Sequence, residues 1–209
     1  MPTLVIETAT AACSVALIDG ARVIASAHEV VGRGHAERLI PMIAELLESK
    51  VPDAILVDCG PGSFTGVRVG IAAARGLAIG WGVPVTGYSS LALLAAASFA
   101  AHPDRSRLAV VLEGGHGEVF MQHFAAPLAA VTPLVSALPE AALAAVHGLP
   151  IIGSGVQRLA RLDPALDMHD ALPDAASAAL LGAAQRDLPP RPIYGRAPDA
   201  KPTAAQTKP

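Results

Sequence analysis

The stretch from Gly60 to Gly70 reads GPGSFTGVRVG, and it separates a short apolar run from a long apolar helix pattern. The run at 54–58 is continuously apolar up to its final acid, which is typical of a central strand. The pattern after the turn predicts a helix over about 65–79. A glycine-rich turn that opens a helix presents backbone N–H groups at the positive end of the helix dipole. The turn is therefore either a phosphate cradle or a device for tight helix packing, and the residues alone favour neither.

Two known loop motifs do not match this stretch. A Walker A loop needs Gly-Lys-Ser/Thr, whereas Gly66 is followed by Val67 and Arg68. A nucleophile elbow needs a glycine where Pro61 stands. The turn is neither of these motifs.

The elements on either side of the turn decide the fold class. Asp19-Gly20 is a strong hairpin signal between two apolar runs. The first half is expected to contain strands at 3–7, 13–18 and 22–30, a helix at 35–48, a strand at 54–58, a helix at 65–79, a strand at 83–86 and a helix at 89–100. A strand meander followed by strands with crossover helices matches the half-domain of the ribonuclease H-like and actin-like ATPase folds. We therefore expect an α/β, actin-like protein of two lobes, the second reduced.

The chain changes character near residue 102, where we expect a domain boundary. A hairpin at 108–112 and 119–124, a helix at 138–146, a strand at 150–152 and a helix at 174–184 follow. The predicted organisation is an N-terminal lobe over 1–101, a smaller C-terminal lobe over 102–188, and a Pro-rich, partly mobile tail over 189–209. No internal repeat has a convincing period.

Composition narrows the class of protein. The chain has 209 residues and a formal net charge of −3, which argues against binding nucleic acid by bulk electrostatics. Two cysteines, Cys13 and Cys59, indicate a reducing compartment. The charge-free stretch 76–103 is interrupted by glycines and a proline, so it does not predict a membrane span. We expect a cytoplasmic protein.

The first two helices predict a docking surface. The helix at 35–48 has one broad apolar face, and the helix at 65–79 is apolar nearly all round except for two arginines. Small residues permit close approach of another helix, so a helix of a partner protein could pack on this surface. The alternative is that the surface is buried within the protein's own domain. The predicted contact residues are Leu39, Met42, Ile43, Arg68, Ile71, Ala72 and Arg75.

The end of the first strand carries a weak trace of a catalytic site. Actin-like ATPases have an acid and a glycine-containing turn here to hold metal and phosphate, but no glycine follows this acid. The positions of such a vestigial phosphate site are Glu7, Thr8, Gly60, Gly62 and Ser63. The histidines show no metal-ligand spacing, and no Ser-His-Asp or Cys-His arrangement can be defended from spacing. We expect no catalytic residues, no metal and no cofactor.

Several stretches together resemble one family. They are LVIETATAACSVAL at 4–17, GHAERLIPMIAELL at 34–47, GPGSFTGVRVGIAAARGLA at 60–78, GEVF at 117–120 and the closing PIYGRAPDAK at 192–201. The chain resembles the TsaB family (older name YeaZ), the accessory subunit for threonylcarbamoyladenosine formation at position 37 of tRNA. Glu7 departs from the family's usual Asp, and Leu112-Glu113-Gly-Gly-His departs from its usual Asp-Ala-Arg.

This resemblance implies a subunit without catalysis of its own. It implies a heterodimer with the paralogue TsaD through the first two helices, recruitment of the ATPase TsaE, and contact with tRNA only through the complex. In TsaD the first helix carries two metal-binding histidines, of which only His35 stands here. Three alternatives remain open: a small actin-like phosphotransferase or nucleotide-binding enzyme, an M22-type metallopeptidase, and a homodimer with a separate role.

Overall fold

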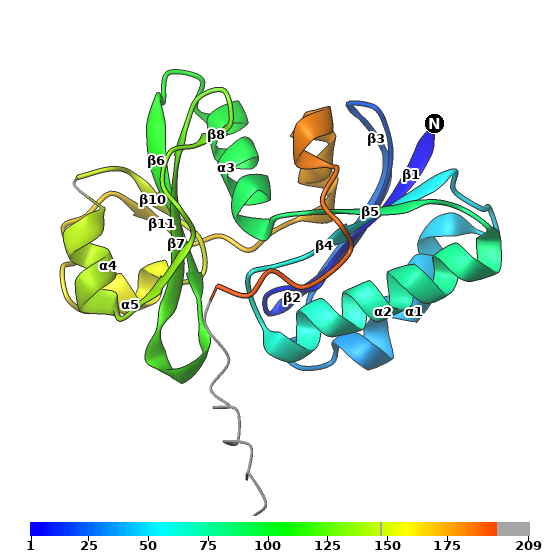
Figure 1. Cartoon of the computed structure of the whole chain (residues 1–209), viewed down its shortest axis with the longest axis horizontal. Helices are drawn as coiled ribbons and strands as arrows, with labels where there is room; N and C mark the ends of the chain where they lie inside the picture. Colours follow the sequence, from blue (N-terminus) through cyan, green and yellow to red (C-terminus); the bar gives the residue numbers. More distant parts are fainter. Residues whose placement is uncertain (147, 196–209) are drawn as a thin grey trace, which may run out of the picture.

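The computed structural model, which describes residues 1–146 and 148–195, has two lobes that lie side by side (Figure 1). The first lobe contains a five-stranded sheet of order β3-β2-β1-β4-β5. The pairs β1–β2 and β2–β3 are antiparallel, and the pairs β1–β4 and β4–β5 are parallel. Its elements are β1 (Pro2–Glu7), β2 (Ala12–Asp19), β3 (Arg22–Val30), α1 (His35–Leu47), β4 (Ala54–Asp58), α2 (Phe64–Trp81) and β5 (Val85–Tyr88).

Helices α1 and α2 cover one face of this sheet and contact each other. Alternation along β1 divides the side chains between the two faces: Leu4 and Ile6 pack toward α1 and α2, whereas Val5 packs on the opposite side. The meander and crossover helices expected from the sequence are confirmed, with element ends shifted by one or two residues.

The second lobe repeats this topology with mostly shorter elements. Its sheet has the order β11-β10-β6-β7-β8, and the central pair β6–β10 is parallel while β6–β7 is antiparallel. The elements are β6 (Arg107–Glu113), β7 (Val119–Ala125), β8 (Ala129–Ala130), β9 (Val135–Ala137), α4 (Pro139–Ala145), β10 (Ile151–Ile152), α5 (Val156–Ala160) and β11 (Met168–His169). The lobes are thus related by topology, although the sequence shows no repeat.

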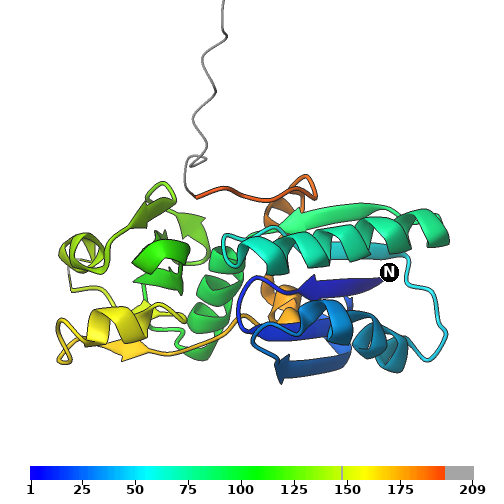
Figure 2. The ribbon, with the colours of Figure 1, turned by 90° about the horizontal axis from the view of Figure 1, so that it is seen from below.

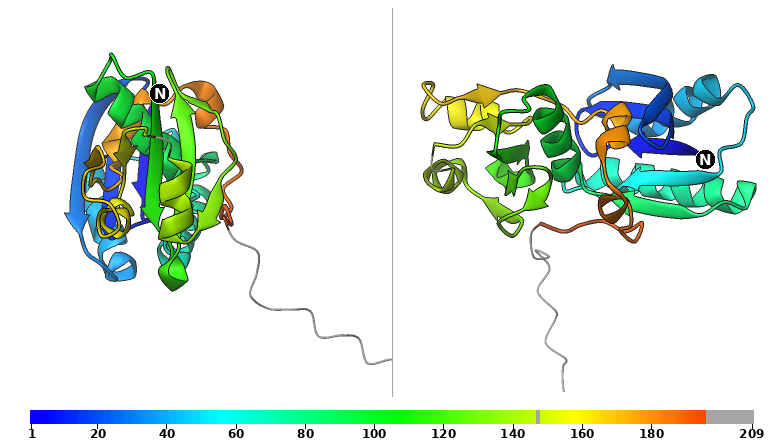
Figure 3. Two further views of the ribbon diagram at one scale, coloured as in Figure 1. Left: turned by 90° about the vertical axis from the view of Figure 1, so that its left-hand side faces the viewer. Right: turned by 90° about the horizontal axis from the view of Figure 1, so that it is seen from above.

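Helix α3 (Ser90–Ala101) lies between the two sheets (Figure 3). Leu93 and Ala96 pack toward the first sheet, whereas Leu91, Leu94 and Phe99 pack toward the second. A helix that buries apolar residues on opposite faces has no polar stripe, which explains why SLALLAAASFAA has no charged residue. This helix joins the lobes because it contributes side chains to an apolar cluster in each of them.

The chain returns to the first lobe after the second sheet. The predicted helix at 174–184 is replaced by two short 3₁₀ helices, η2 (Ala175–Leu180) and η3 (Ala183–Gln185), and η2 packs on β2 and α3. Residues 175–180 and the segment from Leu188 to Ile193 thus contact the first lobe. The rest of the predicted tail, 196–209, lies outside the described residues.

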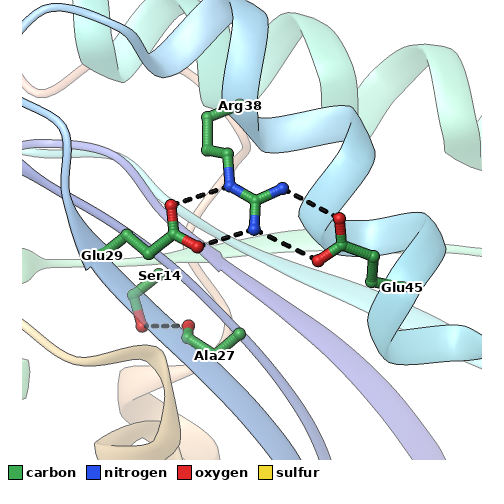
Figure 4. Close-up of polar contacts among 5 residues, drawn as sticks. All are labelled: Ser14, Ala27, Glu29, Arg38 and Glu45. Atoms are coloured by element: carbon green, nitrogen blue, oxygen red, sulfur yellow. Dashed lines mark hydrogen bonds and ion pairs between the residues drawn. The ribbon is translucent and has the colours of Figure 1, made fainter.

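A polar network on the surface joins β3 to α1 (Figure 4). The Arg38 guanidinium donates to both carboxylate oxygens of Glu29, with N–O distances of 2.7 and 2.6 Å, and to both of Glu45, at 3.0 and 3.1 Å. These hydrogen bonds raise the pKa of Arg38 and lower the pKa values of the two glutamates. The network fixes the exposed edge strand to the first helix.

No helix within residues 1–146 and 148–195 has the length and apolarity needed to cross a membrane.

Candidate functional site

The carboxyl end of β1 is closed to solvent. Glu7 and Thr8 have no exposed surface. One carboxylate oxygen of Glu7 accepts from the Ala9 backbone N–H at 2.9 Å, and the other accepts from the Tyr88 hydroxyl at 3.0 Å. The predicted acid is therefore held by its own chain inside the first lobe.

A second buried acid ends the neighbouring strand. Strands β1 and β4 pair in parallel, so Glu7 and Asp58 follow paired residues at one edge of the sheet. Asp58 Oδ1 accepts from the Gly60 N–H at 2.7 Å and from the Ser90 hydroxyl, whereas Oδ2 has no hydrogen-bond partner among the described residues. The two acids thus form a buried pair.

Burial shifts the pKa of both acids upward. Desolvation raises the pKa of Glu7 well above its usual value, and the nearby Asp58 carboxyl raises it further. Desolvation also raises the pKa of Asp58 to about 7, against the lowering effect of its hydrogen bonds from Ser90 and Gly60. The Asp58 carboxyl has a pKa near neutrality, and its second oxygen accepts no hydrogen bond from the described residues. Burial therefore favours the protonated, neutral form of this carboxyl over the charged form.

The glycine-rich turn packs against the end of β1 without a gap. A Cβ at Gly62 would overlap the Ala9 carbonyl, and a Cβ at Gly66 would overlap the Thr8 carbonyl. The Thr8 hydroxyl donates to the Gly66 carbonyl at 2.8 Å. Glycine is therefore required here by close approach of two backbone segments, which is the packing interpretation of GPGSFTGVRVG.

Two backbone N–H groups at this helix start are engaged within the chain. The Ser63 N–H donates to the Ala9 carbonyl at 2.6 Å, and the Gly66 N–H donates to the Ser63 hydroxyl oxygen at 3.2 Å. Ser63 is thus the N-cap of α2. The predicted phosphate-site positions do come together, but as a closed turn.

The opposite face of α2 is open. Phe64 is 71% exposed and Ile79 is 85% exposed, which makes them the two most exposed large apolar side chains among residues 1–146 and 148–195. Ala72 and Arg75 are also exposed, and Arg68 is half-buried. Steps of four, four, three and four residues from Phe64 to Ile79 place these five side chains on one side of the helix. We call residues Phe64, Arg68, Ala72, Arg75 and Ile79 the α2 face.

Comparisons with known proteins give the family. The model for the family described as "TsaD: tRNA N6-adenosine threonylcarbamoyltransferase" matches residues 21–158. The tRNA threonylcarbamoyladenosine biosynthesis protein TsaB of Escherichia coli (strain K12) is 37% identical over 130 residues, which cover 59% of this chain and 55% of that protein. YeaZ from Pseudomonas aeruginosa superposes with a TM-score of 0.76 and 29% identity over 92% of this chain and 99% of that one. This chain belongs to the TsaB (YeaZ) family.

The match also extends along almost the whole chain in one relative. An uncharacterized protein of Mycobacterium tuberculosis (strain ATCC 25618 / H37Rv) is 31% identical over 212 residues, covering 98% of this chain and 96% of that protein. The match to the E. coli TsaB spans only about half of that protein's length. The TsaB family membership also confirms the two-lobed, actin-like fold class expected from the order of elements.

The structure corrects part of the predicted interface of this TsaB-family chain. Leu39, Met42, Ile43 and Ile71 are at most 5% exposed and belong to the core between the helices and the first sheet. A helical pattern shows that a face is apolar, but it does not show whether that face packs against the same chain or against a partner. Here the face packs against the first sheet of the same chain. Arg68, Ala72 and Arg75 lie on the other side of the helix axis, on the α2 face.

Sequence reasoning missed the most exposed members of the same face. Phe64 and Ile79 lie four residues before Arg68 and four after Arg75, so extending the arginine stripe by one helical turn each way would have found them. Asp58 was also missed as a member of the acid pair. Its signal was an acid at the end of a continuously apolar strand, next to another strand with the same ending.

His35 stands where the resemblance places one of the two metal-binding histidines of TsaD. It is buried, and its Nε2–H donates to the Ala12 carbonyl oxygen at 3.0 Å. Within the part of the chain that the structure describes, no three His, Cys, Asp or Glu side chains are grouped to hold a metal ion.

Proposed function

We propose that this TsaB-family chain is a partner subunit without catalysis of its own, acting in formation of N6-threonylcarbamoyladenosine at position 37 of tRNA. It would bind the TsaD-type transferase through the α2 face. The observation that carries this proposal is the exposure of Phe64 and Ile79 at the two ends of a face whose centre is Ala72. Exposed apolar residues around a small residue are typical of a surface that another helix covers.

The closed turn supports the absence of catalysis. The TsaD family model matches this chain over 21–158, which includes the glycine-rich turn but not the end of β1. At the corresponding strand ends this chain has a buried acid pair, and the Ser63 and Gly66 N–H groups at the helix start donate within the chain. We therefore propose that the chain binds and supports the TsaD-type transferase, which carries the metal and phosphate site.

The other expected partners follow from the same role. We propose that an ATPase of the TsaE type joins the pair in a larger complex in the cytoplasm, and that tRNA is bound only through this complex. Two arginines on the α2 face and a net charge of −3 offer few contacts to phosphates. We also propose that the free chain can pair with a second copy of itself when the partner is absent.

The docking test uses two neighbouring alanines. Ala72 is exposed, whereas Ala73 is half-buried against the first-lobe core. Ala72→Glu should leave the melting temperature of the free chain unchanged but prevent co-elution with the TsaD paralogue, because it places a charge in a close-packed seam. Ala73→Glu should lower the melting temperature. Normal co-elution of a folded Ala72→Glu variant would place the interface elsewhere.

The test of the catalytic proposal is an assay of the chain alone. With ATP, or with preformed threonylcarbamoyl adenylate and unmodified tRNA, the purified chain should show only background turnover. Addition of the paralogue should restore transfer. Turnover by the chain alone that disappears in a Glu7→Gln variant would instead establish a phosphotransferase or nucleotide-binding enzyme.

A further inference from the structure

The last described residues form a strap along the edge of the first lobe (Figure 2). The N–H and carbonyl of Leu188 pair with the carbonyl and N–H of Gly87, at 3.0 and 2.7 Å, which adds a short antiparallel bridge to β5. The Ile193 N–H donates to the Cys59 carbonyl at 2.8 Å. We call residues 188–195 the C-terminal strap.

The two arginines of the α2 face hold this strap. Arg75 Nη2 donates to the Pro190 carbonyl at 2.6 Å, and Arg68 Nη2 donates to the Tyr194 hydroxyl at 3.0 Å. The Arg68 guanidinium lies 3.3 Å from the centroid of the Phe64 ring and 5.5 Å from that of Tyr194. Cation–π contacts of this kind orient an arginine without neutralising it.

The resulting surface is apolar and positive. Tyr194 is 66% exposed, so with Phe64 it presents a second large aromatic side chain beside Arg68. Helix α2 contains no acidic residue, and neither Arg68 nor Arg75 takes part in an ion pair within residues 1–146 and 148–195. Each guanidinium keeps donors that no described residue uses.

We infer that the C-terminal strap is part of the docking face, and that the partner protein places carboxylate side chains against Arg68 and Arg75 between Phe64 and Tyr194. The inference rests on the proposed docking through the α2 face and extends it to a segment far away in sequence. Arginine and aromatic side chains contribute most of the binding energy in protein interfaces. The guanidinium groups of Arg68 and Arg75 have no ion-pair partner among the described residues, so carboxylates of the partner are the complementary groups. A tRNA is the weaker occupant, because a phosphate backbone is gripped by many cations and this surface has two.

The experiment measures the affinity of the full chain for the TsaD paralogue by calorimetry at low and high salt. Tyr194→Ala and Arg75→Gln should each weaken binding about tenfold at low salt. Arg75→Gln should also reduce the loss of affinity on raising the salt, since it removes one charge pair. The matched control is Arg107→Gln, which removes an exposed arginine of the second lobe and should bind as the unmodified chain does.

The outcomes separate this inference from the proposed function. If Ala72→Glu abolishes binding while Tyr194→Ala and Arg75→Gln bind normally, the strap is not part of the interface and docking through α2 stands. If Ala72→Glu also binds normally, the docking surface itself is wrong. If the strap variants reduce tRNA binding by the complex and leave the affinity for the partner unchanged, the surface binds RNA and the inference is overturned. Should Tyr194→Ala lower the melting temperature, Arg75→Gln decides, because it removes a charge from the exposed side of α2 and leaves every strap residue in place.

Discussion

The two faces of helix α2 use small residues for opposite reasons. On the buried face, Gly66 and Gly70 leave no room for a side chain because the end of β1 lies directly against them. On the exposed face, Gly76 and Gly80 have open space around the position of a Cβ. The same composition thus means close packing within the lobe on one side, and a surface that a partner could approach closely on the other.

This difference shows why the apolar pattern of α2 was hard to interpret. A helix that is apolar nearly all round must be covered on both sides, but the pattern does not say which cover belongs to the same chain. The first sheet and α1 cover Ile71 and its neighbours, whereas Phe64 and Ile79 stay exposed. The faces can be separated by experiment, because a side chain added to each should have effects of opposite sign.

The largest effect is expected on the buried face. Gly66→Ala should destabilise the free chain by about 3 kcal/mol, because its Cβ overlaps a backbone carbonyl that cannot turn aside. Urea unfolding monitored by circular dichroism measures the change. A loss below 1 kcal/mol would show that the end of β1 and the turn can separate at little cost.

A pH-dependent effect is expected at the buried acid pair. The Asp58 pKa is about 7 in the folded chain and about 4 when unfolded, so between these values the folded state holds a proton that the unfolded state has released. The Asp58 carboxyl therefore makes its full contribution to the free energy of unfolding below pH 4. This contribution is lost as the pH rises to 7, by at most about 1.4 kcal/mol per pH unit.

The matched variant is Asp58→Asn, which keeps the shape and removes the titration. Unfolding free energies at pH 5, 6, 7 and 8 should fall less steeply with pH than those of the unmodified chain, and the variant should be the more stable protein at pH 8. A residual slope is expected from Glu7, whose pKa is raised by the same burial. An unchanged slope would show that Asp58 is not the titrating group.

The exposed face should respond in the opposite direction. Gly76→Ala should stabilise the free chain by about 0.5–1 kcal/mol, because alanine is the better helix former and its Cβ meets nothing. Thermal melting of the free chain measures this gain. If Gly76→Ala destabilises the chain as Gly66→Ala does, the open face is covered within the monomer and the comparison fails.

The smallest effect is expected at the surface network of Arg38. Arg38→Gln removes the ion pairs with Glu29 and Glu45, all of them at least partly exposed to solvent. The melting temperature should fall by only a degree or two in low salt, because exposed ion pairs contribute little and ionic strength screens them. The two proteins should melt together in high salt. A persistent difference there would mean that the side chain packs as well as pairs.

The sequence by itself determined the local elements of the first lobe and their order. Alternation along the strands and the 3.6-residue period of α1 are set by neighbouring residues, so runs such as Ala54–Asp58 predict their own structure. In the structure Glu7, Thr8, Gly60, Gly62 and Ser63 lie at the carboxyl ends of the parallel strands β1 and β4, where such strands bring their ends together.

Only the tertiary structure decided which surfaces are covered. Leu39 and Ile71 are equally suited to a core or to an interface, and the position of the first sheet makes them core. The contacts of Arg68 with Tyr194 and of Arg75 with Pro190 join residues more than a hundred positions apart, and no local pattern encodes them. The second lobe repeats the strand order of the first although the two sequences show no repeat, so the order alone does not require particular side chains. Contacts at long range depend on the shape of the folded chain, whereas periodicity reports only the chemistry of each segment.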